Sequence, residues 1–281
     1  MADLLPGLGK FGLGKLSDLK LFEEPEEEKE EAKNEPVAPV YNEEEFLFDK
    51  TYTCPICDHK YGERTVRTGK ARLLGIDLDL RPRHEQLDVG KYDVISCPKC
   101  GYTVLSRYFA PLSPTMTKLV KENIASSFVS RSEKMAVYTY DTAFERYQLC
   151  LANAIVKRGK DSEKAYICLK TGWILRGMGE HLDKAIEKYD ERLKEIKQRE
   201  QEYLRHAYEG FIKARSTEGY PMCGMDETTL DYLLAALAIG FEEFDVATKM
   251  IGGILASAAA NSRMKDKARE LKEVMQARKG S

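Results

Sequence analysis

Four cysteines form two pairs, and each pair has two residues between its members: Cys54, Cys57, Cys97 and Cys100. Two intervening residues let one tight turn place both thiolates of a pair on a single ion, and four thiolates complete a tetrahedral shell for Zn²⁺. Such a shell is closed to water and substrate, so its role is structural. The spacing therefore predicts one structural zinc ion per chain. The alternative is two disulfides or four free thiols.

A basic stretch lies between the two cysteine pairs. Residues 60–83 carry seven basic and three acidic side chains, a charge of +4 in a chain whose net charge is −2. Such a stretch could hold the phosphates of nucleic acid or of a nucleotide, and strand parity would place Arg64, Lys70 and Arg72 on one face. The alternatives are a solvated surface and a docking site for the chain's own acidic segment. The candidate polyanion-binding residues are Arg64, Arg67, Lys70, Arg72, Arg81 and Arg83.

The candidates for catalysis lie in the same stretch. Asp77 and Asp79 alternate with aliphatic residues over 76–80, so a strand would place both carboxylates on one face, where they could bind a divalent cation or act as an acid–base pair near His84. The simpler interpretation is a strand whose aliphatic residues are buried and whose aspartates face solvent. The chain has no G-x-S-x-G, phosphate-binding lysine loop or H-E-x-x-H motif. We therefore predict no catalytic residue.

Length and composition bound the class of protein. A chain of 281 residues with 43% hydrophobic and 32% charged residues can form about two domains with sizeable cores and long solvated helices. The net charge of −2 excludes a generic nucleic-acid or membrane binder. No apolar run approaches the ~20 residues that span a bilayer, and no signal peptide is evident. Seven cysteines, four of them in zinc spacing, indicate a reducing compartment, so we expect a cytoplasmic location.

The N-terminal part of the chain divides into an apolar arm over residues 1–22 and an acidic linker over 23–45. The arm contains a formal G-x-G-x-x-G match at Gly7, Gly9 and Gly12, but no strand precedes it, so it does not predict a dinucleotide site. The linker holds eleven glutamates and three prolines, which favours a self-repelling, extended spacer. The arm is expected either to be inert or to dock weakly on the helical domain or on a second chain.

Residues 46–112 are expected to form a zinc-ribbon-like β module. β-Branched and aromatic residues are typical of strands, and they flank both cysteine turns. They precede the first turn at 51–53, precede the second turn at 92–95 and follow the second turn at 102–105. The 39 residues between the two cysteine pairs exceed the usual ribbon spacing. An additional hairpin is therefore expected between them.

Residues 113–281 are expected to form an α-helical domain of helical hairpins that is tetratricopeptide-like but degenerate. The expected helices cover residues 114–129, 133–158, 162–178, 181–215, 227–241, 244–260 and 263–278. With the β module before it, this domain makes the predicted fold class α+β and mostly α.

Local signals set the expected helix ends. Ser113 before a proline, Asp161 or Ser162, and Asp226 are the predicted N-caps. The longest of the expected helices has apolar residues at three- and four-residue spacing, and this apolar stripe has a gap at Glu200.

Three segments of the chain carry a family pattern. They read LFDKTYTCPIC at 47–57, TVRTGKARLLGIDLDLRPR at 65–83 and YDVISCPKCGY at 92–102. These segments resemble the bacterial family known as domain of unknown function 2225, and the resemblance covers most of the chain beyond the acidic linker. It implies zinc-knuckle cysteines ahead of a tetratricopeptide-like helical domain and no established activity. The chain departs from a commoner knuckle pattern at Asp58, where a glycine commonly follows the first cysteine pair.

Together these observations predict a cytoplasmic, non-enzymatic protein in which a zinc ribbon precedes a helical scaffold that binds a protein partner. A nucleic-acid-binding module that uses the basic residues of 60–83 is the alternative. An enzyme built on Asp77, Asp79 and His84 is the second alternative. No membrane association is expected, and the oligomeric state and the identity of the partner are left open.

Overall fold

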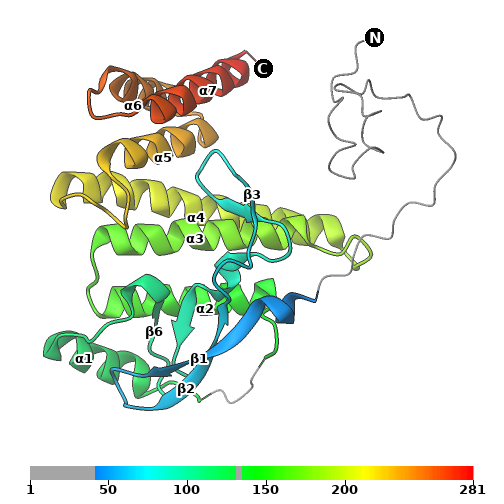
Figure 1. The fold of residues 1–281 in the computed structure, drawn as a ribbon, viewed down its shortest axis with the longest axis vertical. Helices are drawn as coiled ribbons and strands as arrows, with labels where there is room; N and C mark the ends of the chain where they lie inside the picture. Colours follow the sequence, from blue (N-terminus) through cyan, green and yellow to red (C-terminus); the bar gives the residue numbers. More distant parts are fainter. Residues whose placement is uncertain (1–41, 131–134, 281) are drawn as a thin grey trace, which may run out of the picture. The chain divides into compact units, whose positions relative to one another are not determined.

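The computed structural model describes residues 42–130 and 135–280 (Figure 1). The predicted apolar arm at 1–22 and most of the acidic linker at 23–45 lie outside these residues. The described chain begins with a short 3₁₀ turn, η3 (Glu43–Phe46), in which the side chain of Asn42 accepts a hydrogen bond from the Glu44 backbone. The described residues belong to one compact unit.

The described strands form three antiparallel hairpins of two strands each. The strands are β1 (Leu47–Thr53), β2 (Lys60–Val66), β3 (Leu73–Ile76), β4 (Pro82–His84), β5 (Val94–Ser96) and β6 (Thr103–Leu105). The β1–β2 turn contains the first cysteine pair, and the β5–β6 turn contains the second. The β3–β4 hairpin lies between them in sequence, which confirms that the long interval between the two pairs forms an additional hairpin.

Helices make up most of the remaining chain, which confirms the predicted α+β, mostly α fold class. They are α1 (Pro114–Val120), continued by a π-helical turn η6 (Lys121–Ala125), α2 (Tyr140–Val156), α3 (Asp161–Glu180), α4 (Tyr189–Thr217), α5 (Glu227–Gly240), α6 (Phe244–Ala256) and α7 (Ser262–Lys279). Figure 1 shows α2 to α7 stacked in chain order. Of the described helices, none is both long enough and apolar enough to cross a membrane.

Two predicted N-caps are confirmed and one is wrong. The hydroxyl of Ser113 accepts from Met116 N at the start of α1, and the carboxylate of Asp226 accepts from Thr229 N at the start of α5. The start of α3 was predicted at Asp161 or Ser162, but its N-cap is Lys160, which makes no side-chain capping bond. The exposed N–H groups there are instead bound by a distant residue, because the carboxylate of Glu218 accepts from Ser162 N at 3.0 Å.

Two helices begin later than their apolar spacing predicts. The predicted start at 133 gives way to an N-cap at Thr139, whose hydroxyl accepts from Thr142 N. The predicted start at 181 is also wrong, because α4 begins at Tyr189 after Lys188, whose φ of 60° is left-handed and cannot continue a right-handed helix. At 29 residues α4 is still about 43 Å long.

Buried clusters connect the β module to the helices. Val94 of β5 and Leu105 of β6 pack with residues of α2 and α3 in one core cluster. Val120 of α1 packs with the four paired cysteines in another. A third and larger cluster joins α3, α4, α5, α6 and α7. Residues on both sides of position 112 therefore share cores, and the domain boundary at that position stays a prediction.

Candidate functional site

The four paired cysteines converge. Cys54 Sγ lies 3.6 Å from Cys100 Sγ, and Cys57 Sγ lies 3.7 Å from Cys97 Sγ. All four sulfur atoms lie within 4.8 Å of one another, so the cluster could hold one metal ion. Three of the four residues are buried and Cys57 is half-buried. The prediction that the two pairs share one site is supported by this geometry.

Both cysteine turns have the same backbone conformation. Asp58 N donates to Cys54 O at 3.0 Å, and Gly101 N donates to Cys97 O at 3.0 Å. The residue after each pair is left-handed, with φ of 56° at Asp58 and 72° at Gly101. Aspartate is among the residues that tolerate this region, so the departure from glycine at Asp58 leaves the turn intact.

The sulfur cluster has its own hydrogen bonds. Hydrogen bonds from Cys100 and Cys54 hold the pKa of the Cys97 thiol far below its ordinary value. Hydrogen bonding to Cys54 and Cys97 raises the pKa of Cys100. A metal ion replaces the shared protons of such a cluster, because thiols bind metals as thiolates.

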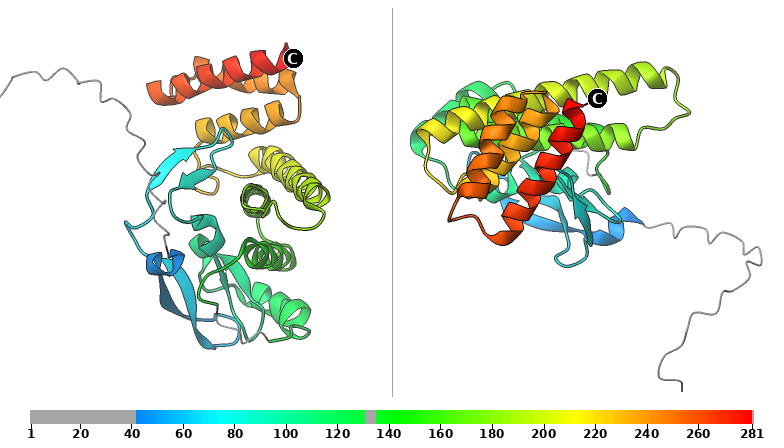
Figure 2. Two further views of the ribbon diagram at one scale, coloured as in Figure 1. Left: turned by 90° about the vertical axis from the view of Figure 1, so that its right-hand side faces the viewer. Right: turned by 90° about the horizontal axis from the view of Figure 1, so that it is seen from above.

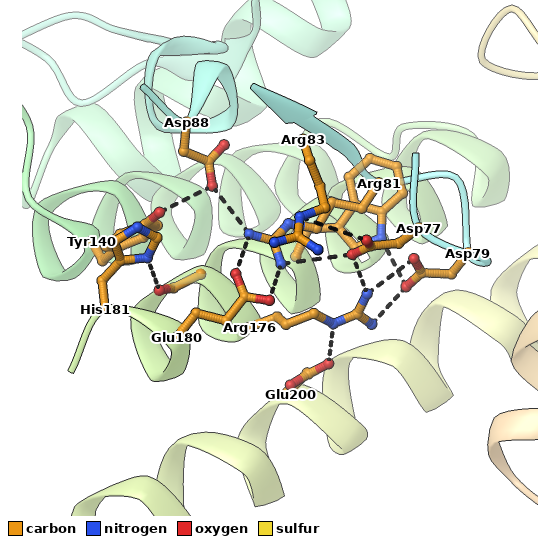
Figure 3. Close-up of polar contacts among 12 residues, drawn as sticks. Asp77, Asp79, Arg81, Arg83, Asp88, Tyr140, Arg176, Glu180, His181 and Glu200 are labelled. Carbon is orange, nitrogen blue, oxygen red and sulfur yellow. Dashed lines mark hydrogen bonds and ion pairs between the residues drawn. The ribbon is translucent and has the colours of Figure 1, made fainter. Parts of the chain in front are cut away.

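A second polar centre lies where the turn of the β3–β4 hairpin meets α3 and α4 (Figure 3). Arg176 of α3 donates to both carboxylate oxygens of Asp79, at 2.7 and 3.0 Å, and to Asp77 at 3.2 Å. Its Nε donates to Glu200 of α4 at 2.8 Å. The indole N–H of Trp173 also donates to Asp79, at 3.1 Å. We call this set of contacts the Arg176 cluster.

Arg81 makes a parallel set of contacts one residue beyond the hairpin turn. Its guanidinium pairs with both oxygens of Glu180, at 3.0 and 2.9 Å. It also lies 3.7 Å from Asp88 and 3.8 Å from Asp77. Tyr140 OH donates to Asp88, which ties the start of α2 to the same group (Figure 3).

Burial changes the acidity of these groups. Burial lowers the pKa of Arg176, but the hydrogen bond and charge of Asp79 outweigh it, so the pKa lies above its ordinary value. Burial raises the pKa of Glu200, against a smaller lowering effect of Arg176. Arg176 therefore stays protonated, and its charge opposes the cost of burying the Glu200 carboxylate.

The sequence predicts that the aliphatic residues of 76–80 are buried and that the aspartates face solvent. This prediction is wrong. Ile76 is 46% exposed and Leu78 is 44% exposed, whereas Asp79 is 7% exposed. The strand ends at Ile76, because Leu80 N donates to Asp77 O and Asp77 N donates to the Arg81 carbonyl, which closes a turn. The aspartates then point toward Arg176, Ile76 and Leu78 are left outside, and Leu80 packs against the helical core.

The hairpin turn forms one wall of an open cavity of about 540 Å³. We call this cavity the groove. Helices α4, α5 and α7 form its other wall. The residues that line it are Ile76, Asp77, Leu78, Asp79, Arg176, Gln201, Leu204, Ala236, Leu237, Ile239, Gly240, Phe241, Leu271 and Arg278.

The candidate polyanion-binding residues do not share one strand face. β2 ends at Val66, and a turn follows in which Lys70 N donates to Arg67 O. Arg64 is 15% exposed and pairs with Glu44 and Asp49. Arg81 is buried in the contacts described above.

The other four candidates lie on the surface: Arg67, Lys70, Arg72 and Arg83. Arg72 pairs with Glu85 at 3.4 Å, and Arg83 lies 4.0 Å from Asp77. These four residues still form an exposed basic surface on and beside the hairpin.

The candidate acid–base residues are brought together only in part. Asp77 and Asp79 meet on Arg176, which neutralises them. In the described residues His84 makes no hydrogen bond to either aspartate, and burial lowers its pKa. The arrangement stabilises the hairpin and does not resemble a pair of free catalytic carboxylates.

Arg176 and Glu200 are the residues that sequence reasoning did not place in a site. Glu200 did leave a signal, because it is the gap in the apolar stripe of α4 and is 9% exposed. A charged residue on a buried helix face requires a partner, and Arg176 on the buried part of α3 is that partner. The contact of Arg176 with Asp79 spans 97 residues of sequence, which no local pattern reveals.

Comparison with known proteins gives one match. No curated protein and no solved structure matches the chain. A family model described as an uncharacterised protein conserved in bacteria (DUF2225) matches residues 47–275, which include the four paired cysteines, the β3–β4 hairpin and the Arg176 cluster. This match covers most of the chain, and the protein therefore belongs to that bacterial family.

Proposed function

We propose that this protein is a non-enzymatic scaffold, held together in part by a structural zinc ion, that binds a protein partner in the groove. The observation that carries the proposal is the position of Ile76 and Leu78. Both side chains are almost half exposed, and both line the groove opposite apolar residues of α5 and α7. A rigid groove with aliphatic walls and a few charged groups is suited to a polypeptide segment.

Zinc is the metal that the cysteine cluster fits best. A tetrahedral shell with Zn–S bonds of about 2.3 Å has sulfur–sulfur edges of about 3.8 Å. Two of the six sulfur–sulfur distances in the cluster are 3.6 and 3.7 Å, and all six are within 4.8 Å. Four thiolate donors select soft or borderline ions, and the closed shell supports a structural role. All seven cysteines are free thiols, which supports a reducing compartment such as the cytoplasm.

The stacked helices support a scaffold role. Consecutive antiparallel helices that pack on their neighbours form extended surfaces that commonly bind peptides, and tetratricopeptide arrays are one example. We propose that α2 to α7 act in this way, as degenerate repeats. Arg176 neutralises Asp77 and Asp79, which favours binding over acid–base catalysis.

Site-specific photo-crosslinking tests partner binding in the groove. Gly240 lines the groove, and a side chain added there would meet no atom within 4 Å. A benzophenone amino acid at Gly240, in the full-length protein in cells, should give discrete crosslinks to protein. The matched control is Gly252 of α6, which is equally open but does not line the groove.

The pattern of adducts decides the proposal. Protein adducts at Gly240 that are absent at Gly252 and insensitive to nuclease support partner binding in the groove. Equal adducts at both positions, or none at Gly240, contradict it.

Nucleic-acid binding is the second candidate, and the exposed Arg67, Lys70, Arg72 and Arg83 favour it. No aromatic side chain lies between β3 and β4 to stack on bases, which argues against single-strand binding. If nucleic acid binds there, affinity should fall steeply with salt, and neutralising each phosphate-contacting residue should lower the log–log salt slope by roughly 0.7–0.9. Filter binding at about 50 mM salt measures this, and the absence of retention would exclude the candidate.

A further inference from the structure

The β3–β4 hairpin exposes an unusual concentration of aliphatic side chains. Leu73 is 52% exposed, Leu74 60%, Ile76 46% and Leu78 44%. These are four of the nine exposed large hydrophobic residues in the described chain, and the other five are dispersed over other elements. Single exposed aliphatic residues are ordinary, but a cluster of them marks an interaction surface. We call these four residues the hairpin face.

The same hairpin has an open strand edge. In the part of the chain that the structure describes, β3 pairs with β4 and with no other strand. β4 begins with Pro82, which has no backbone N–H to donate, so β3 is the better edge for further pairing. At Gly75 of β3 an added Cβ would meet no atom within 4 Å, so the face of the strand at that residue is open. An open edge of this kind can accept an additional strand.

Exposed charges beside the hairpin face are mainly basic. Arg67, Lys70, Arg72 and Arg83 are exposed, and the exposed carboxylates that pair with the hairpin are Glu85, on Arg72, and Glu180, on Arg81. The side chain of Arg72 is 73% exposed, and that of Arg83 is 59% exposed. This surface is therefore complementary to a partner that carries negative charge.

The hairpin is held in place before any partner arrives. Asp77 and Asp79 in its turn are bound by Arg176, and Arg81 is bound by Glu180. Figure 2 (left) shows the hairpin running beside the stacked helices toward α5. A strand that is fixed in this way loses little further conformational entropy on binding.

We propose that β3 binds an extended peptide segment, with alternating acidic and aliphatic residues, as an additional β-strand. The peptide backbone pairs with the open edge of β3. Its aliphatic side chains lie on the face of Leu73 and Ile76, and its carboxylates lie on the opposite face, with Arg72 and Arg83. This inference rests on the proposed protein-binding function and names the class of partner.

A model peptide tests the inference. The probe is a fluorescein-labelled peptide of about eight residues with alternating glutamate and valine, titrated with the full-length protein and followed by anisotropy. Methylating alternate backbone nitrogens of the probe removes its pairing edge without changing its charge. This change should weaken binding by about tenfold, because one or two net hydrogen bonds are lost. A lysine–valine peptide should also bind more weakly, because its charge is reversed.

Matched protein variants locate the site. Leu74→Glu should weaken binding of the glutamate–valine probe, since it places a carboxylate against an acidic strand, and it should fold because Leu74 is exposed. The control Ile212→Glu changes an exposed aliphatic residue of α4, 41% exposed, and should leave binding unchanged.

Three results would overturn the proposal: equal binding of the methylated probe, no effect of Leu74→Glu, or binding of oligothymidylate or phosphatidylglycerol vesicles in place of the peptide. The last result would assign the surface to nucleic acid or to lipid. In each of these cases, protein crosslinks from Gly240 would still support partner binding in the groove. A failure of the strand-binding inference can therefore be distinguished from a failure of the proposed function.

Discussion

Replacing Arg176 with methionine tests whether the Arg176 cluster fixes the hairpin to the helices. The change removes the guanidinium from two buried carboxylates, Asp79 at 7% exposure and Glu200 at 9%. Removing one partner of a buried ion pair costs about 3–5 kcal/mol of unfolding free energy. Because the Arg176 side chain is itself 24% exposed, we expect the lower end of this range, about 3 kcal/mol.

The loss should depend on pH. Burial already raises the pKa of Glu200, and Arg176 opposes that shift, so the variant raises this pKa further. A carboxyl whose folded pKa is raised contributes stability below its unfolded pKa and loses it as pH rises through the folded pKa. The loss of unfolding free energy in Arg176→Met, relative to the unaltered protein, should therefore be larger at about pH 7 than at about pH 5.

Urea unfolding measured by tryptophan fluorescence provides the assay. Trp173 is the single tryptophan of the chain and donates to Asp79, so its emission reports on the cluster itself. Adding Glu200→Leu to Arg176→Met should recover about 1 kcal/mol or more, because one unpaired charge is removed.

The control variant is Arg192→Met, which removes surface ion pairs from a side chain that is 40% exposed. It should lower the free energy of unfolding by less than about 1 kcal/mol. Equal costs for Arg176→Met and Arg192→Met, or a cost for Arg176→Met that does not change with pH, would refute the reasoning.

Three further predictions concern the metal centre and the core. Protein purified without chelator should contain about one zinc per chain. Cys97→Ser should lose both zinc and stability, and full zinc retention would contradict the site. Gly101→Ala should lower the free energy of unfolding by about 2–4 kcal/mol, because φ is positive there and the new methyl would overlap an aromatic ring. The control Gly252→Ala, in open helical surroundings, should not destabilise the protein. A 113–281 fragment should be helical by circular dichroism but unfold at lower urea than the full chain, and an equal midpoint would show that the shared core clusters contribute nothing.

The cysteine cluster could be predicted from sequence because its determinants are local. Two residues between paired cysteines fix the turn, and strand-forming residues beside each pair fix the flanking hairpins. The caps at Ser113 and Asp226 were predictable for the same reason, since each bonds to a backbone N–H three residues away. Such signals act within one turn and depend little on the rest of the fold.

The hairpin could not be predicted in the same way, because its conformation depends on distant residues. Alternation over 76–80 correctly separates Ile76 and Leu78 from the two aspartates, although Leu80 packs against the helical core. Which set faces inward is decided by Arg176, which lies 97 residues beyond Asp79. A hydrophobic pattern assumes an apolar core, whereas the local interior here is a buried arginine with Glu200 beside it. The gap at Glu200 indicated a buried charge, but a gap alone does not name its partner.

The cysteine cluster and the hairpin are parts of one loop. The 39 residues from 58 to 96 begin and end at the cysteine cluster, and the β3–β4 hairpin lies within them. The second cysteine turn is joined to α2, because Asn153 donates to Gly101 O at 3.0 Å. The turn of the hairpin is joined to α3 by Arg176. The loop is thus fixed at its base by the cysteine cluster and at its far end by ion pairs, and closing the base with a metal removes much of the loop's freedom in the unfolded chain. A metal that takes no part in chemistry would therefore still matter for binding, because it helps to hold the hairpin face and one wall of the groove against the helices.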